Sequence, residues 1–398
     1  MEVHLVTGGA GFIGSNYIRY ILSNRNDVAV IVLDYLNYSG NLNNLKEFLS
    51  DNVFVPNEHV ELTEVEFSGS MIHIDRRKIQ ARLEMMKFKL DGYRTREFSP
   101  REVEKVLYKR RLVTVVANVM DRKTVKSLLD ISDVVIHLAA ETHVDRSILD
   151  PGIFLITNIY GTQNLLECGK NANMKKFIHV STDEVYGPAE NGKSFTEDHP
   201  LNPKNPYSVS KVTADELVRV YQRIYDLPAV VVRPTNNFGP YQYPEKLIPL
   251  TVIKALRDER IPIYGDGKQV RDWLHVEDMA IALELIIRKG KVGEVYNVAG
   301  RNQRENLYVV RTILEILQKP EDLITYVEDR PSHDRRYSID DEKIRSELGF
   351  KSRSFEETIP NVVKWYVENE WWWKNILEND ENFIKFMKEW YGKRLSSR

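Results

Sequence analysis

The feature that most constrains the fold is a glycine turn near the start of the chain, between an apolar strand and a helix. Residues 3–7 are mostly apolar, with His4 and Thr7 as the exceptions. Glycines follow at 8, 11 and 14, and the apolar residues of 12–23 have helical spacing. Such glycines allow a tight turn and let backbone N–H groups approach a pyrophosphate at the positive end of a helix. The turn therefore predicts a dinucleotide-binding βα unit; the alternative is a tight turn without a ligand.

An acidic residue at the end of the next strand supports this prediction. The apolar residues 28–33 lead directly to Asp34, which stands 20 residues after Gly14. A carboxylate there accepts hydrogen bonds from an adenosine ribose and repels a 2′-phosphate, so the sequence favours NAD over NADP. The glycine spacing is GxxGxxG and not GxGxxG, which indicates cofactor binding of the short-chain dehydrogenase type.

The alternation of strand and helix continues beyond the turn. Further strands are predicted at residues 112–117, 134–140, 176–181 and 229–234, and helices at 153–169 and 207–225. Alternating elements with continuously apolar strands predict an α/β protein, a Rossmann-type doubly wound parallel sheet wrapped by helices. We expect residues 1–235 to form this domain. Residues 236–398 are predicted to form a smaller substrate-binding lobe, part of which can return to the Rossmann domain.

Residues 51–110 interrupt the rhythm and are predicted to form an inserted α+β segment. Alternating apolar residues at 60–74 predict a β-hairpin, residues 76–90 a helix, and the Ser-Pro pair at 99–100 a capped helix start. Residues 68–111 hold 13 Lys and Arg against 6 Asp and Glu. We interpret the segment as a solvated or dimer-contacting insertion near the adenine end of the cofactor or the domain edge, without influence on the sugar chemistry; contact with an anionic partner is the alternative.

The tail of the chain is rich in aromatic residues. Five of the six tryptophans lie within residues 362–395. This pattern predicts a docked pair of amphipathic helices, with an aromatic binding cage as the alternative.

Composition excludes several classes of protein. The 56 basic and 58 acidic residues sum to a net charge of −2, which gives no electrostatic footprint for nucleic acid or an anionic membrane. The single cysteine, Cys168, excludes an internal disulfide and a zinc site built on paired thiolates, and fits a reducing compartment. No apolar span reaches the length of a membrane helix, and the N-terminus lacks the basic start of a signal peptide. We expect a cytoplasmic protein without metal, nucleic-acid or membrane partners.

Two clusters carry candidate chemistry. Tyr207 and Lys211 stand at i and i+4 of a helix and so share a face, where the ammonium favours the phenolate and moves Tyr207 toward general-base use near neutral pH. Lys211 can also hold a nicotinamide ribose. Asp183 and Glu184 follow the strand at 176–180, and strand ends of a parallel sheet face the ligand crevice. Two adjacent acids there can divide into a protonated donor and an ionised base; the alternative is a helix cap beside a solvated Glu.

Several longer motifs are spread along the chain: TGGAGFIGSN, DYLNYSGN, HLAAETHVDRSI, STDEVYG, NPYSVSK, RPTNNFGPYQYPEKLIPL, IPIYGDGKQVRDWLHVEDMA and DRPSHDRRY. Together they resemble the dTDP-glucose 4,6-dehydratases, a family of extended short-chain dehydrogenases/reductases. The resemblance covers essentially the whole chain except about residues 51–110. The adjacent Asp-Glu of STDEVYG is its most specific element.

The resemblance implies a lyase that uses NAD to convert dTDP-glucose to dTDP-4-keto-6-deoxyglucose. In such an enzyme Tyr207 takes the proton of the sugar 4-hydroxyl, beside Thr182, while C4 gives its hydride to NAD. Glu184 then removes the C5 proton, Asp183 protonates the departing C6 hydroxyl, and the hydride returns to C6. The family also implies a homodimer formed by the helices at 158–168 and 207–225. Alternatives are a UDP-glucose 4,6-dehydratase, a nucleotide-sugar 4-epimerase, a UDP-glucuronate decarboxylase and an NAD-bound regulator without turnover.

The resemblance also assigns ligand contacts to positions of this sequence. The implied catalytic residues are Thr182, Asp183, Glu184, Tyr207 and Lys211. The implied cofactor contacts are Gly8, Gly11, Phe12, Ile13, Gly14, Asp34, Asn37, Asn118, Val119, Leu138, Ala139, Glu141, Thr157, Tyr207, Lys211 and Asn237. The implied nucleotide-sugar contacts are Thr182, Asn236, Lys246, Leu247, Pro262, Tyr264, Arg271, Asn306, Arg330 and His333. Arg271 and Arg330 suit a diphosphate, which favours forked guanidinium donors.

Two positions depart from the family pattern. Asn118 stands in Ala-Asn-Val where the family usually has Gly-Asp-Ile, so it would meet the adenine amino group as a neutral acceptor. Ser332 replaces the usual glycine in the loop of Arg330.

Overall fold

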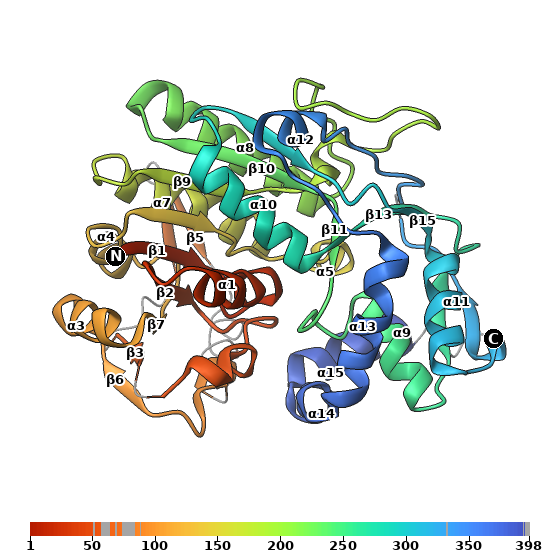
Figure 1. Cartoon of the computed structure of the whole chain (residues 1–398). Coiled ribbons are helices and arrows are strands. Elements are labelled where there is room, and N and C mark those ends of the chain that lie inside the picture. The colour runs from red at the N-terminus through yellow and green to blue at the C-terminus, as the bar shows by residue number, and fades with distance from the viewer. Residues whose placement is uncertain are drawn as a thin grey trace.

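A nine-stranded parallel sheet forms the centre of the molecule (Figure 1). The computed structural model describes residues 1–50, 52–56, 64–67, 70–73, 84–87, 89–331, 333–392 and 394. Along the sheet the strands are β14 (Val295–Val298), β10 (Ala229–Pro234), β9 (Lys176–Val180), β8 (Val134–His137), β1 (Glu2–Thr7), β2 (Val28–Asp34), β7 (Leu112–Val116), β3 (Val53–Val55) and β6 (Thr95–Glu97). The predicted Rossmann-type α/β fold and its strands are confirmed, with bounds that shift by a few residues.

Helices cover both faces of the sheet because each central strand is apolar on both sides. Leu5 and Ile31 pack toward one helical layer, and their neighbours Val6 and Val32 pack toward the other. The first layer holds α3 (Pro100–Arg110), α4 (Arg122–Leu129), α7 (Gly161–Gly169) and α8 (Pro206–Tyr225). The second layer holds α1 (Phe12–Asn24), α10 (Val276–Lys289) and α12 (Glu342–Leu348). Among the described residues, no helix is long and apolar enough to cross a membrane.

The predicted helix at 153–169 is divided in the structure. It consists of α6 (Pro151–Phe154), a π-helical segment η2 (Leu155–Tyr160) and α7, after the short α5 (Val144–Leu149). A π segment within a helix is typical of functional sites. Here it carries Thr157, a predicted cofactor contact, to the wall of the central cavity.

The insertion lies at the outer edge of the sheet, which its place between β2 and β7 predicts. β3 pairs with β7, and β6 pairs with β3, so both extend the sheet. The predicted hairpin is confirmed for β4 (Glu64–Phe67) and β5 (Ser70–His73), which pair antiparallel. Residues 84–87 and 89–90 are helical, whereas the rest of the predicted helix at 76–90 lies outside the described residues. The predicted cap before α3 is wrong in one respect, because the Ser99 side chain makes no capping hydrogen bond.

The second lobe contains the remaining elements, which lie to the right in Figure 1. Its strands are β11 (Asn236–Phe238), β12 (Ile261–Tyr264), β13 (Val270–His275), β15 (Gln303–Glu305) and β16 (Ile324–Val327). Its helices are α9 (Leu247–Leu256), α11 (Asn306–Leu317), α13 (Phe355–Glu368), α14 (Glu370–Asn379) and α15 (Glu381–Met387), with the short helical turns η4 (Glu321–Leu323) and η5 (Lys388–Gly392). Two further turns, η1 (Leu42–Phe48) after β2 and η3 (Asp183–Tyr186) after β9, belong to the Rossmann half. The chain crosses between the lobes more than once, since β14, α10 and α12 pack with the Rossmann sheet.

The aromatic tail packs on the second lobe as docked helices, three where the sequence predicted two. Trp372, Trp373 and Trp390 are buried, whereas Trp371 remains 46% exposed. The cluster that α13 and α14 form with α9 and α11 also includes Tyr38, from the loop after β2. The tail helices thus join the second lobe to the loop after β2, on the cofactor side of the molecule.

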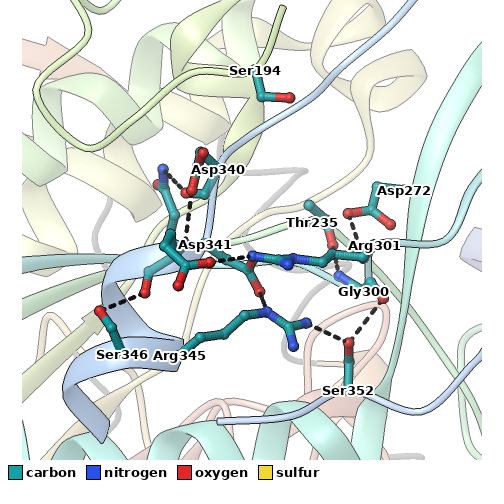
Figure 2. Close-up of polar contacts among 12 residues, drawn as sticks. Ser194, Thr235, Asp272, Gly300, Arg301, Asp340, Asp341, Arg345, Ser346 and Ser352 are labelled. Atoms are coloured by element: carbon teal, nitrogen blue, oxygen red, sulfur yellow. Dashed lines mark hydrogen bonds and ion pairs between the residues drawn. The ribbon is translucent and has the colours of Figure 1, made fainter. Parts of the chain in front are cut away.

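A polar network fixes one crossing between the lobes (Figure 2). Arg301 and Arg345, from the segment after β14 and from α12, both donate to Asp341, over 2.7 and 2.8 Å. The backbone N–H of Arg301 donates to Asp272 of β13 over 3.1 Å. Because Asp272 follows Arg271, this network holds in place the strand that carries a predicted diphosphate contact.

Candidate active site

A cavity of about 410 Å³ lies between the carboxyl ends of the sheet strands and the second lobe. Its wall brings together nearly all the site residues that the sequence predicts, from the glycine turn at one end to His333 at the other. Two predicted residues, Glu141 and Lys211, are not on the wall. Ligand crevices of open parallel sheets form at this edge, where neighbouring crossovers diverge.

The glycine turn provides a cradle that no other residue type would leave open. Gly8 has a φ of +70°, and a Cβ there would lie 2.7 Å from the backbone nitrogen of Ala139. A Cβ on Gly14 would lie 2.5 Å from the carbonyl oxygen of Gly8. The N-cap of α1 is Gly11, so no side chain caps the helix start beside the cavity. This geometry fits a dinucleotide pyrophosphate at the helix N-terminus.

Asp34 lies at the tip of β2, on the cavity wall. Its carboxylate accepts hydrogen bonds from the backbone N–H groups of Ala10 (3.0 Å) and Leu36 (2.8 Å). Burial raises the pKa of Asp34, and these two hydrogen bonds act in the opposite direction. The side chain is thus fixed where an adenosine ribose would need an acceptor.

Glu141 lies behind this part of the wall and supports it. The Asn37 side chain donates to the Glu141 carboxylate, and the Glu141 backbone exchanges hydrogen bonds with the Asn158 amide. Glu141 therefore orients Asn37, which does line the cavity. Asn118 also lines the cavity, and its side-chain oxygen accepts from the Met120 N–H over 3.1 Å.

Tyr207 and Lys211 lie on α8, but the predicted effect of the ammonium on the phenol is wrong for this structure. The Lys211 ammonium donates to the Val180 carbonyl of β9 over 2.7 Å, and burial lowers the pKa of Lys211 to about 8. Burial, and then the charge of Glu184, raise the pKa of Tyr207. Desolvation outweighs any attraction from the lysine, because the lysine is turned toward the strand.

Asp183 and Glu184 lie in η3, immediately after β9, and their environments differ. Asp183 is buried, and burial together with the neighbouring Glu184 charge raises its pKa to about 8. Its Oδ1 accepts from the Thr182 hydroxyl over 3.3 Å, while its Oδ2 is buried without a partner. Glu184 is less buried; its Oε2 accepts from Asn205 over 3.2 Å and lies 3.4 Å from the Tyr337 hydroxyl, which donates to Asp334 over 2.7 Å. At neutral pH Asp183 is therefore protonated, whereas Glu184 is held by the Asn205 amide.

The end of the cavity formed by the second lobe is lined by cations. Arg271 donates to the carbonyl oxygens of Val270 and Asp334, and burial lowers its pKa. Arg330 donates to Asp145 over 3.0 Å; burial opposes its charge, but Asp145, Glu184 and Tyr337 together outweigh burial and raise its pKa. Lys246 and His333 complete this end of the wall, His333 as a neutral imidazole because burial lowers its pKa to about 4. Such a set of donors fits a diphosphate.

Several polar atoms on the wall are buried and have no hydrogen-bond partner within the protein. Four are His143 Nδ1, Ser181 Oγ, Glu245 Oε1 and Trp273 Nε1, and the other five are Asp183 Oδ2, Asn236 Oδ1, Asn237 Oδ1, Asn306 Oδ1 and Arg330 Nε. A buried polar atom without a partner is costly, so such atoms indicate a ligand or ordered water. The latter five belong to residues that the sequence assigns to the site.

The sequence missed a contribution from the tail. Tyr391, in η5, lines the cavity, and its hydroxyl lies 3.1 Å from the Tyr264 hydroxyl. Trp390 donates to the same Tyr264 oxygen over 2.6 Å, and Tyr264 donates to Asp145 over 2.8 Å. The aromatic residues of the tail predict a packed helix, but they do not predict which part of the molecule this helix contacts. Ser332, the other departure from the family, lies outside the described residues.

The fold and the site define a class of protein: a dinucleotide-dependent enzyme of the short-chain dehydrogenase/reductase type, with a second lobe for a phosphorylated substrate. A family model described as GDP-mannose 4,6 dehydratase matches residues 85–362. The dTDP-glucose 4,6-dehydratase of Neisseria meningitidis is 41% identical, with 95% of this chain and 96% of that protein covered. The low-salt glycan biosynthesis protein Agl12 of Haloferax volcanii is 39% identical over 92% of this chain and 99% of its own length.

Solved structures agree with these relatives. DesIV, a dTDP-glucose 4,6-dehydratase from Streptomyces venezuelae crystallised with NAD and TYD, superposes with a TM-score of 0.75 at 36% identity, covering 93% of this chain and 98% of DesIV. The dTDP-glucose 4,6-dehydratase of Bacillus anthracis, crystallised with NAD, gives 0.74 at 36%, with 94% and 99% covered. The chain belongs to this nucleotide-sugar 4,6-dehydratase family, among the dTDP-glucose 4,6-dehydratases.

Proposed function

We propose that the chain catalyses the NAD-dependent 4,6-dehydration of dTDP-glucose to dTDP-4-keto-6-deoxyglucose, the activity that its relatives' names state. The observation that carries the proposal is the pair of acids beside Tyr207. Asp183 keeps its proton at neutral pH while Glu184 accepts a hydrogen bond from Asn205, and both line the cavity. An elimination of water needs this combination of one acid and one base.

The cofactor end of the cavity fits NAD. The cradle at Gly8 and Gly14 would hold the pyrophosphate, Asp34 the adenosine ribose, and Asn118 the adenine. Bound there, NAD supplies reversible hydride exchange with the sugar. The protein positions the reacting groups and controls the protons.

The first proton step falls to Tyr207. Its phenol exchanges a proton with the sugar 4-hydroxyl, and Thr182, which hydrogen-bonds the phenol, holds the same sugar oxygen. Because burial raises the pKa of Tyr207, its phenolate, once formed, is a stronger base for the proton of the sugar 4-hydroxyl. Lys211 acts through its bond to Val180, which fixes α8 against β9 at the site.

The elimination falls to the two acids. With a ketone at C4, the C5 proton becomes acidic, and Glu184 removes it as the base. Asp183 gives its proton to the departing C6 hydroxyl, which leaves as water. The pKa of about 8 keeps Asp183 protonated through neutral pH, and its unpartnered Oδ2 is free to make this bond.

The test compares dTDP-glucose and UDP-glucose side by side with the purified chain. We expect a product lighter than dTDP-glucose by one water, with a higher kcat/KM for dTDP-glucose. One methyl group is worth only about 1–3 kcal/mol, so a preference of roughly tenfold to a hundredfold is expected. A product of unchanged mass would indicate a 4-epimerase. Loss of carbon dioxide, when UDP-glucuronate is supplied in a parallel assay, would indicate a decarboxylase, and the absence of any turnover would indicate an NAD-bound regulator. Each of these results would refute the proposal.

A homodimer completes the proposal. Apolar side chains on η2 and α8 are exposed in the single chain, among them Leu155 (42%) and Ile224 (64%). The two elements pack against one another and so form one surface. An exposed apolar surface of this kind fits a second copy of the chain through a twofold axis. With a single cysteine, Cys168, the chain also suits the cytoplasm.

A further inference from the structure

Three carbonyl oxygens converge on one point in the loop that follows Asp34. They belong to Asn37, Tyr38 and Gly40, and the Lys89 ammonium from the insertion donates to them over 2.6, 2.9 and 2.9 Å. Carbonyl dipoles that point at one another repel, so a loop of this shape needs a cation at its centre. The ammonium takes the place that a bound alkali ion would otherwise fill.

The same ammonium contacts the tail of the chain. Its Nζ lies 3.6 Å from Asp380, and both side chains are buried, with exposed fractions of 7% and 5%. Asp380 also accepts a hydrogen bond from Tyr243, a cavity residue, over 2.8 Å, and its other oxygen caps α15. Lys89 is therefore the junction between the insertion, the loop after β2 and the second lobe.

Packing around the junction agrees with this arrangement. Met86 of the insertion is buried in a cluster with Ala10 of the glycine turn and with Leu36 and Leu42, which flank the loop. The Tyr93 hydroxyl donates to Asn43 over 2.9 Å. Residues 84–87 and 89–93 thus cover the outer side of a loop whose inner side, at Asn37 and Gly40, lines the cofactor end of the cavity.

We propose that Lys89 is a positioning residue for the cofactor. Its ammonium binds the carbonyl oxygens of Asn37, Tyr38 and Gly40 and pairs with Asp380, and through these contacts the insertion raises the affinity for NAD. The inference deepens the proposed function and rests on NAD as its cofactor. It gives the insertion, which we expect near the adenine end of the cofactor, a role in supporting the adenosine-side wall and none in the sugar chemistry.

The test is NAD binding by the apo-protein, measured by titration without any sugar. Lys89→Met removes the charge and keeps the length of the side chain. We expect its dissociation constant for NAD to rise at least tenfold, or about 1.4 kcal/mol, while kcat at saturating NAD falls less than threefold. Lys87→Met is the matched control, since Lys87 is an exposed lysine of the same segment, and its NAD affinity should equal that of the wild type.

A second variant guards against loss of the fold. Asp380→Asn removes the charge, while an asparagine can still cap α15 and accept from Tyr243. We expect a twofold to fivefold weaker NAD affinity. If Lys89→Met folds and binds NAD within twofold of the wild type, or if it unfolds and Asp380→Asn binds NAD as the wild type does, the inference is wrong. Because no sugar is present, a chain that failed to dehydrate dTDP-glucose would still give this answer.

Discussion

The raised pKa of Asp183 has a consequence for stability as well as for catalysis. The carboxyl has a pKa of about 8 in the folded chain, against an ordinary value of 3.8. Between these values the unfolded chain is ionised at this position and the folded chain is not, so the unfolded state gains stability as pH rises. Each pH unit in this window costs the folded protein about 1.4 kcal/mol, to a limit on the order of 5 kcal/mol near pH 8. Asp183 is 3% exposed, so solvent screening reduces this little.

Asp183→Asn removes this cost because the amide has the same shape and does not ionise. We expect the variant to gain stability over the wild type with rising pH, by about 1.4 kcal/mol per unit between about pH 5 and about pH 8. Urea unfolding of both proteins over this range measures the difference, and other titrating groups cancel because both proteins share them. The exposed Asp91→Asn is the control for loss of one carboxyl group, and it should show no such trend.

The same variant loses the acid of the elimination. We expect dehydration to slow by roughly a factor of 10² to 10⁴, with C4 oxidation preserved, so that absorbance of the reduced nicotinamide accumulates during turnover. If the stability difference between Asp183→Asn and the wild type does not change with pH, then Asp183 is ionised in the folded chain. It could not then be the proton donor, and the division of roles with Glu184 would fail.

Three further predictions concern other parts of the site and the surface. Tyr207→Phe should lower the rate of nicotinamide reduction by at least about 10²-fold while dTDP-glucose still binds, as calorimetry can measure, because the phenol supplies the first proton step; turnover near the wild-type rate would remove Tyr207 from that role. Gly8→Ala should weaken NAD binding and destabilise the chain by about 1–3 kcal/mol, because the new Cβ would meet the Ala139 nitrogen at 2.7 Å at a φ of +70°; unchanged NAD affinity would contradict the cradle. Ile224→Glu should convert a dimer to a monomer in sedimentation, because a charge would enter an apolar contact, and a dimer that persists at the wild-type affinity would place the interface elsewhere.

The sequence predicted the sheet well because its strands are buried on both faces. A strand such as β2 is apolar at every position from residue 28 to residue 33, and no surface helix has that pattern. The glycine turn was equally informative, since a φ of +70° at Gly8 leaves few alternatives to glycine. These signals are local, so they survive in a single sequence.

The electrostatics of the site could not be predicted in the same way. The i, i+4 spacing of Tyr207 and Lys211 is correct, yet the direction of the phenol's pKa is the reverse of the prediction, since burial dominates and Lys211 bonds to Val180. The predicted division between Asp183 and Glu184 agrees with their surroundings. It depends on the burial of Asp183 and on Asn205, which lies outside the local motif.

The sequence by itself determined the Rossmann-type fold and the position of the glycine turn, because periodicity and backbone constraints act over a few neighbouring residues. Only the tertiary structure decided that Tyr391 reaches the cavity and that Lys89 fills a cage of carbonyl oxygens beside Asp380. Burial and charge pairing depend on which distant segments meet, and the free energy of a buried charge is set by those partners and not by its sequence neighbours.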